Sequence, residues 1–93
     1  MWKSINELCN DLTPLQVACL HGHSTIIKIL LNHEAEVNIQ NSLGNTALHY
    51  AYMTELSSIK CGRQLLNAHA NTDIQNHDGL YPWEFALCLH PMV

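Results

Sequence analysis

A near-duplication inside the chain limits its fold more than any other feature. Residues 30–41 read LLNHEAEVNIQN and residues 65–76 read LLNAHANTDIQN, so that seven of the twelve positions are identical. Three related segments begin upstream or downstream of these copies: TPLQVA at Thr13, TALHYA at Thr46 and YPWEFA at Tyr81, spaced 33 and 35 residues apart. This spacing indicates an array of small units that bury a continuous core by stacking.

Each unit has the pattern of two short helices. In the first unit, Thr13 can cap a helix that starts at Pro14, and the chain then breaks at Gly22. A second apolar stripe follows at helical spacing, made of Ile26, Ile27, Leu30 and Leu31. The pattern predicts a helical hairpin with one shared buried side, and Leu15, Leu48 and Trp83 as the large side chains between neighbouring units.

The period and the motifs resemble the ankyrin repeat, which recurs every 33 residues and opens with T-P-L-H-x-A. The chain also has Gly22-His23 and the tail Ala-x-Val-Asn at 35–38. The resemblance implies an all-α fold, an ankyrin-repeat solenoid of stacked helix-turn-helix hairpins with short β-hairpin fingers. We expect a single domain over 1–93, with a lead-in at 1–12, repeat 1 at 13–41, repeat 2 at 42–76 with a two-residue insertion, and a partial repeat 3 at 77–93.

Some residues depart from the pattern at sensitive positions. Glu34 and His69 replace the glycine that normally ends the second helix in the left-handed conformation. Asp11 stands where the later turns have a glycine, and Gly62 stands inside a helix where repeat 1 has Ile27. A glycine there costs about 1 kcal/mol in helix propensity and removes a packing side chain.

The link inside repeat 2 and the two ends also differ from a regular array. The stretch 52–58 is two residues longer than its counterpart and lacks Gly-His, which predicts an irregular connection. Neither end supplies a polar capping repeat. We therefore expect one of two alternatives: either the chain is a piece of a longer array, or it covers its uncapped ends by self-association.

Composition and charge narrow the classes of partner. Four Lys and Arg against eight Asp and Glu give a net charge of −4, and no basic patch that would attract nucleic acid or an anionic membrane. The chain has no apolar run long enough to span a bilayer and no signal-peptide core at its start, so we expect an intracellular protein, cytoplasmic or nuclear. Its four cysteines form no CxxC pair and are expected to be free thiols.

The histidines invite a chemical role, but each has a structural explanation. His21 and His23 lie beside Cys19, yet residues two apart on a helix face apart, and two ligands do not make a zinc site. By the resemblance, the His23 imidazole supports the loop between helices, and His49 hydrogen-bonds to backbone and ties neighbouring repeats together. Because no nucleophile motif or phosphate loop is present either, we expect no enzyme activity, no cofactor and no metal.

The remaining function is binding. The resemblance implies a non-catalytic protein–protein interaction module that binds a partner of unknown identity through its concave surface of fingers and first helices. The alternative is a regulatory or substrate-recruiting fragment of a larger enzyme, kinase or channel. The apolar contact residues are expected to face outward with a polar rim. The full expected contact set is Asn10, Leu12, Leu20, His21, Ser42, Leu43, Asn45, Met53, Thr54, His77, Asp78 and Leu80.

Overall fold

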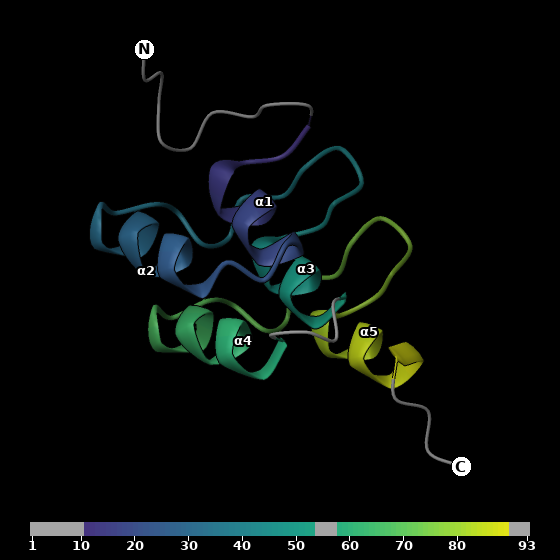
Figure 1. Ribbon diagram of the computed structural model, residues 1–93. Helices are drawn as coiled ribbons and strands as arrows, with labels where there is room; N and C mark the ends of the chain where they lie inside the picture. Colours follow the sequence, from purple (N-terminus) through teal and green to yellow (C-terminus); the bar gives the residue numbers. More distant parts are fainter. Residues whose placement is uncertain (1–10, 54–57, 90–93) are drawn as a thin grey trace.

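The structure, a computed structural model, describes residues 11–53 and 58–89 (Figure 1). Its helices are α1 (Pro14–Leu20), α2 (Ser24–Asn32), α3 (Ala47–Met53), α4 (Ser58–Asn67) and α5 (Pro82–Leu89). Helices α1 and α2 form one hairpin, α3 and α4 form the next, and α5 begins a third unit. One layer contains α1, α3 and α5 side by side, and α2 packs against α4 in the other. The predicted stack of helical hairpins is confirmed.

The core lies between these two layers. Leu15 and Leu48 are each 1% exposed, and the small Ala18 and Ala51 are buried beside them, where the helices approach closely. Trp83, at the corresponding place in α5, is 49% exposed, because no further unit lies beyond it in the described part of the chain. Its predicted role between units is therefore only partly met.

The apolar stripe of α2 is narrower than predicted. Ile27 and Leu30 are buried, and Leu31 is half-buried, but Ile26 is 47% exposed. The equivalent of Ile26 in the next unit is Cys61, which is fully buried. Cys61 lies beside Cys19 of the preceding unit, whereas α2 has no preceding unit among the described residues.

The first helix begins as its sequence predicts. The Thr13 hydroxyl accepts a hydrogen bond from the Gln16 amide at 3.1 Å, and the Gln16 side chain accepts one from the Thr13 amide at 3.0 Å. The second helix begins differently, because the His23 side chain makes no capping hydrogen bond to α2. The turn is held instead by Gly22 at φ 69° and by the His23 amide, which donates to the Ala18 carbonyl at 2.9 Å.

Two loops connect the units, finger 1 (residues 38–45) and finger 2 (residues 73–80), and both lie on the same side of the helices (Figure 1). No β-strand is present among the described residues, so the fingers are turns rather than the predicted short β-hairpins. In finger 1 the buried Asn41 side chain accepts from the amides of Leu43 and Asn45, at 3.1 and 3.0 Å. Side-chain bonds thus replace a strand ladder at the tip.

The glycine inside α4 has a packing reason. A Cβ on Gly62 would lie 3.4 Å from the nearest atom of the Tyr52 ring. Tyr52 packs against the core from α3, so its ring occupies the space that the side chain of Ile27 fills in the first unit. The predicted irregular link between α3 and α4 falls largely on residues 54–57, which lie outside the described part of the chain.

In the part of the chain that the structure describes, three residues other than glycine have left-handed backbone. Asp11 has φ 68°, and Glu34 and His69 each have φ 65°. Glu34 and His69 directly follow the helix ends at which the sequence pattern places a glycine, so the predicted left-handed conformation is confirmed. A side chain with a Cβ pays about 1–2 kcal/mol in this region.

We expect Glu34→Gly and His69→Gly each to stabilise the fold by about 1 kcal/mol, because glycine adopts this backbone without a Cβ clash. Urea unfolding followed by circular dichroism measures the change. The control is Glu34→Ala, which removes the same carboxylate and keeps the strained Cβ, so it should give no comparable gain. Equal stabilisation by alanine and glycine would show that charge, rather than backbone strain, is responsible.

Candidate partner-binding surface

The two finger tips are joined to each other by hydrogen bonds. The His77 amide of finger 2 donates to the Leu43 carbonyl of finger 1 at 2.9 Å. Deeper in the fingers, the Asn76 side chain donates to the Asn45 side chain at 2.9 Å. Gly44 lies against this junction, because a Cβ there would be 2.7 Å from the His77 nitrogen. The tips therefore form one ordered row rather than two independent loops.

The row continues toward the start of the described chain. The carboxylate of Asp11 accepts hydrogen bonds from the Ser42 amide at 3.1 Å and from the Ser42 hydroxyl at 2.6 Å. Asp11 occupies the position equivalent to Gly44, at a similar positive φ. The Asp11 carboxylate thus joins its turn to finger 1, as the His77 amide and the Leu43 carbonyl join finger 2 to finger 1.

One position in each unit ties the first helix to the backbone around it. Gln16, His49 and Glu84 each accept a hydrogen bond from the amide three residues earlier. The Gln16 side-chain nitrogen donates to the Asn45 carbonyl at 3.3 Å and to the Ile39 carbonyl at 2.8 Å, and the His49 Nε2 pairs with the Leu80 carbonyl at 2.9 Å. The predicted role of His49 as a link between units is confirmed.

The hydrogen bonds of His49 fix its tautomer. Nδ1 accepts from the Thr46 amide at 3.0 Å, and an amide can only donate, so Nδ1 carries no proton. Nε2 therefore holds the proton and donates it to the Leu80 carbonyl. Burial lowers the pKa of His49, and the bond to the Leu80 carbonyl opposes this only in part.

The described cysteines are buried free thiols, as the sequence predicts for the chain's cysteines. Burial raises the pKa of Cys19, and the neighbouring Cys61 raises it further. Burial also raises the pKa of Cys61, against a smaller lowering by Lys60. Neither thiol is ionised at neutral pH, so neither is a ready nucleophile. The side chains of Cys9 and Cys88 lie outside what the structure describes.

The histidine cluster differs from its predicted geometry. The rings of His21 and His23 are 5.9 Å apart and both are exposed, although residues two apart were expected to face apart. The reversal at Gly22 brings them together. Across the described residues, no three histidine, cysteine or carboxylate side chains gather closely enough to hold a metal ion.

The predicted contact residues separate into three groups. Four of the predicted side chains on the fingers are exposed, and the exposed fraction of Leu43 is 61%. His21 is also exposed, directly after the end of α1. The exposed members are His21, Ser42, Leu43, His77 and Asp78; the half-buried ones are Leu12, Leu20, Met53 and Leu80; and Asn45 is buried. Asn10 and Thr54 lie outside the described residues.

The expected apolar contact surface is therefore smaller than the sequence suggests. Leu12, Leu20 and Met53 pack against the core and are half-buried, so each exposes only part of the side chain that was predicted to face outward. Asn45, 5% exposed, is held by its bonds to Asn76 and to the Tyr50 hydroxyl, so its accessible role is corrected to a structural one. Leu43 remains as the one large apolar side chain of the set that is mostly exposed.

A family model describing ankyrin repeats in three copies matches residues 2–78. The chain belongs to the ankyrin repeat family. Ankyrin repeats generally mediate protein–protein interaction and are not catalytic modules. No helix in the described part of this ankyrin chain is long and apolar enough to cross a membrane.

Curated relatives place similar segments within longer proteins. The chain is 39% identical over 71 residues to a putative ankyrin repeat protein of Rickettsia bellii, and 32% identical over 82 residues to the transient receptor potential cation channel subfamily V member 5 of Oryctolagus cuniculus. It is 39% identical over 69 residues to the tyrosine-protein kinase Shark of Drosophila melanogaster. These alignments cover 74%, 78% and 74% of this chain but 28%, 11% and 7% of the relatives.

Sequence reasoning missed the residues that order the ankyrin fingers. Gln40 donates to the Gly44 carbonyl at 2.9 Å and to the Gln75 carbonyl at 3.2 Å, and Gln75 donates to the Gly79 carbonyl at 2.8 Å. Asn76 organises finger 2 as Asn41 organises finger 1. The signal was present, because Ile-Gln-Asn closes both copies of the duplicated segment without change.

Proposed function

We propose that the chain is a non-catalytic protein–protein interaction module that binds its partner along the row of finger tips and the adjoining ends of α1 and α3. The observation that supports this proposal most is that Leu43 combines an exposed apolar side chain with an ordered backbone. Its side chain is 61% exposed, while its carbonyl is fixed by the His77 amide of the next finger. An exposed apolar side chain on ordered backbone loses little conformational entropy on binding.

Exposed polar side chains accompany Leu43 on the predicted surface. Ser42, His77 and Asp78 are exposed on the two fingers, and His21 is exposed at the end of α1. A central apolar contact with a hydrogen-bonding rim is the common anatomy of a protein interface. The half-buried Leu20 and Met53 would contribute their accessible edges, and Leu80 would do so from finger 2.

The proposal predicts that Leu43→Asp weakens partner binding by about 30-fold or more, corresponding to the loss of one central contact of about 2 kcal/mol. Folding stability should change by no more than about 0.5 kcal/mol, because the side chain is exposed. A photo-cross-linking amino acid at position 43 recovers the partner from cells. Its affinity is then measured by calorimetry against the parent and variant chains.

The matched control is Ile29, 51% exposed on α2. A cross-linker at position 29 should not recover the same protein, and Ile29→Asp should leave its affinity unchanged. If the partner cross-links from position 29, or if Leu43→Asp binds as tightly as the parent, the proposed surface is wrong.

The alternative is a regulatory or recruiting segment of a larger enzyme, kinase or channel. It is favoured by the relatives named as a kinase and a channel, of which the chain matches 7% and 11% of the length. An antibody against residues 65–76 distinguishes the two on an immunoblot. A band at the mass of 93 residues supports the independent module, and a much larger band supports the segment.

A further inference from the structure

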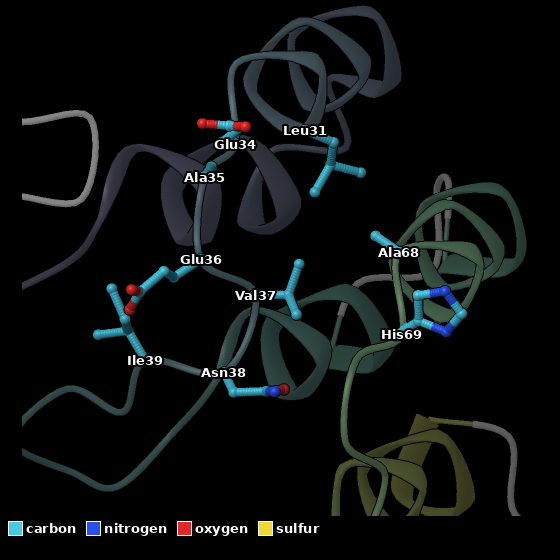
Figure 2. A pocket seen from close by; sticks show the side chains of 9 residues that line it. All are labelled: Leu31, Glu34, Ala35, Glu36, Val37, Asn38, Ile39, Ala68 and His69. Carbon is cyan, nitrogen blue, oxygen red and sulfur yellow. The ribbon is translucent and has the colours of Figure 1, made fainter.

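A groove lies between the segment that leaves α2 and the end of α4 (Figure 2). Its volume is about 560 Å³, within the range typical of ligand sites. None of the twelve residues predicted to bind a partner lines it. The lining residues are Leu31, Glu34, Ala35, Glu36, Val37, Asn38, Ile39, Ala68 and His69.

Three of the lining side chains that face one another across the groove are apolar. Figure 2 shows the side chains of Leu31, Val37 and Ala68 pointing into a shared space from α2, from the segment after it, and from the end of α4. All three are half-buried, so they keep accessible surface in addition to their core contacts. Such a space suits one aliphatic side chain of a partner, whose burial would remove apolar surface from water.

The two edges of the groove carry the residues with left-handed backbone. Glu34 and His69 both have φ 65°, and they lie on opposite sides of the groove. Glu34 follows α2 and His69 follows α4. Glycine would adopt this backbone more easily, yet a carboxylate and an imidazole are present. Because a left-handed residue ends each helix at this position, both side chains are held at fixed backbone positions beside the groove.

The charge along the edge is negative. Glu34 and Glu36 are exposed, and their carboxylates point outward from the segment beside the groove (Figure 2). Among the described residues, no lysine or arginine lines the groove, and the net charge of the chain is −4. The Glu34 carboxylate would meet a residue that flanks an inserted side chain rather than the side chain itself. Basic flanking residues fit this arrangement.

We propose that this groove binds a segment of another protein in which an aliphatic side chain is flanked by arginine or lysine. The aliphatic side chain occupies the space between Leu31, Val37 and Ala68, and a flanking basic residue pairs with Glu34. This surface is separate from the finger row, so it gives the chain a second contact with a protein partner.

The test uses two acetylated and amidated probes, the peptides Gly-Arg-Leu-Arg-Gly and Gly-Glu-Leu-Glu-Gly, titrated into the full ¹⁵N-labelled chain at neutral pH. The basic peptide should give saturable chemical-shift changes in the amides of residues 34–39 and 68–69, and the acidic peptide should give none. No saturable shift with the basic peptide, or equal shifts with both, would overturn the proposal.

Two substitutions separate binding from folding. Glu34→Gln and Glu34→Gly should each weaken binding of the basic peptide about threefold to fivefold, the upper part of the range of an exposed ion pair. Glu34→Gly should do so while raising the melting temperature, which excludes unfolding as the cause. Asp73→Asn, an exposed carboxylate on finger 2, is the matched control and should leave the affinity within about twofold.

Two further variants and a control without peptide test whether the peptide occupies the groove. Ala68→Leu fills the apolar space and should reduce peptide binding more than tenfold, whereas Leu43→Asp should not affect it. If the amides of residues 34–39 shift with protein concentration in the absence of peptide, a second copy occupies the groove and the proposal fails. Unchanged binding by Glu34→Gln would likewise contradict it.

Discussion

Replacing Gly44 with alanine is expected to destabilise the fold by about 3 kcal/mol, against about 1–2 kcal/mol for the same change at Gly79. The two glycines have nearly the same backbone, at φ 80° and 78°. Their surroundings differ. A Cβ at Gly44 would lie 2.6 Å from the His77 ring and 2.7 Å from the His77 nitrogen, whereas a Cβ at Gly79 meets nothing within 4 Å.

The ring of His77 is exposed and can rotate away, but its backbone nitrogen is bound to the Leu43 carbonyl beside Gly44. Alanine at position 44 must therefore separate the fingers and break this bond, whereas alanine at position 79 pays only for its left-handed φ. Urea midpoints measured by circular dichroism give both values. Equal losses in the two variants would show that the finger junction contributes nothing to stability.

Acid is expected to destabilise the fold through His49. The neutral ring satisfies the Thr46 amide and the Leu80 carbonyl at once. Protonating Nδ1 would set an N–H against the Thr46 N–H, so the charged ring fits neither this geometry nor its buried site. The folded pKa of His49 is consequently lower than the unfolded value of about 6.5.

The direction of the pH dependence follows from proton binding. Below about pH 6.5 the unfolded chain binds a proton at His49 that the folded chain resists, so stability is present above this pH and is lost as the pH falls. The loss continues until the folded state also becomes protonated, and its slope is at most about 1.4 kcal/mol per pH unit for one group. Unfolding curves collected between neutral and mildly acidic pH measure it.

His49→Gln is the decisive variant, because Gln16 already performs the same two tasks in the first unit. We expect it to fold near neutral pH and to flatten the loss of stability in acid. His49→Ala should instead cost about 3 kcal/mol at neutral pH, since it leaves the buried Thr46 amide without its partner, removes one of the two hydrogen bonds to the Leu80 carbonyl and empties the site of a fully buried ring. The five other described histidines are exposed and remain in both variants as an internal control.

An undiminished acid slope in His49→Gln would assign the pH dependence to other groups.

The fold could be predicted from the sequence because the chain repeats one sequence pattern. The duplicated segment at 30–41 and 65–76, with the period of 33 residues, specifies which positions are equivalent in three dimensions. Equivalence was sufficient to predict the left-handed Glu34 and His69, and the link made by His49. None of these required knowledge of a side-chain contact.

The candidate surface was less predictable because exposure depends on neighbours. Leu20 and Leu43 are both leucines at positions expected to face outward, but Leu20 rests on the core and Leu43 does not. Trp83 and Leu48 are equivalent in the repeat, yet only Leu48 is covered on both sides. The space that Tyr52 takes beside Gly62 is also a property of packing, which a linear pattern does not contain.

The position shared by Gln16, His49 and Glu84 gives the stack a direction in which it can open. Gln16 and His49 each combine an acceptor for their own helix start with a donor for the turn ahead, but an ionised Glu84 has no proton to donate. The forward links among the described units are therefore two: Gln16 joins α1 to finger 1, and His49 joins α3 to finger 2. Loss of the His49 link would let α5 separate from α3 while Gln16 still joins the first unit to the second.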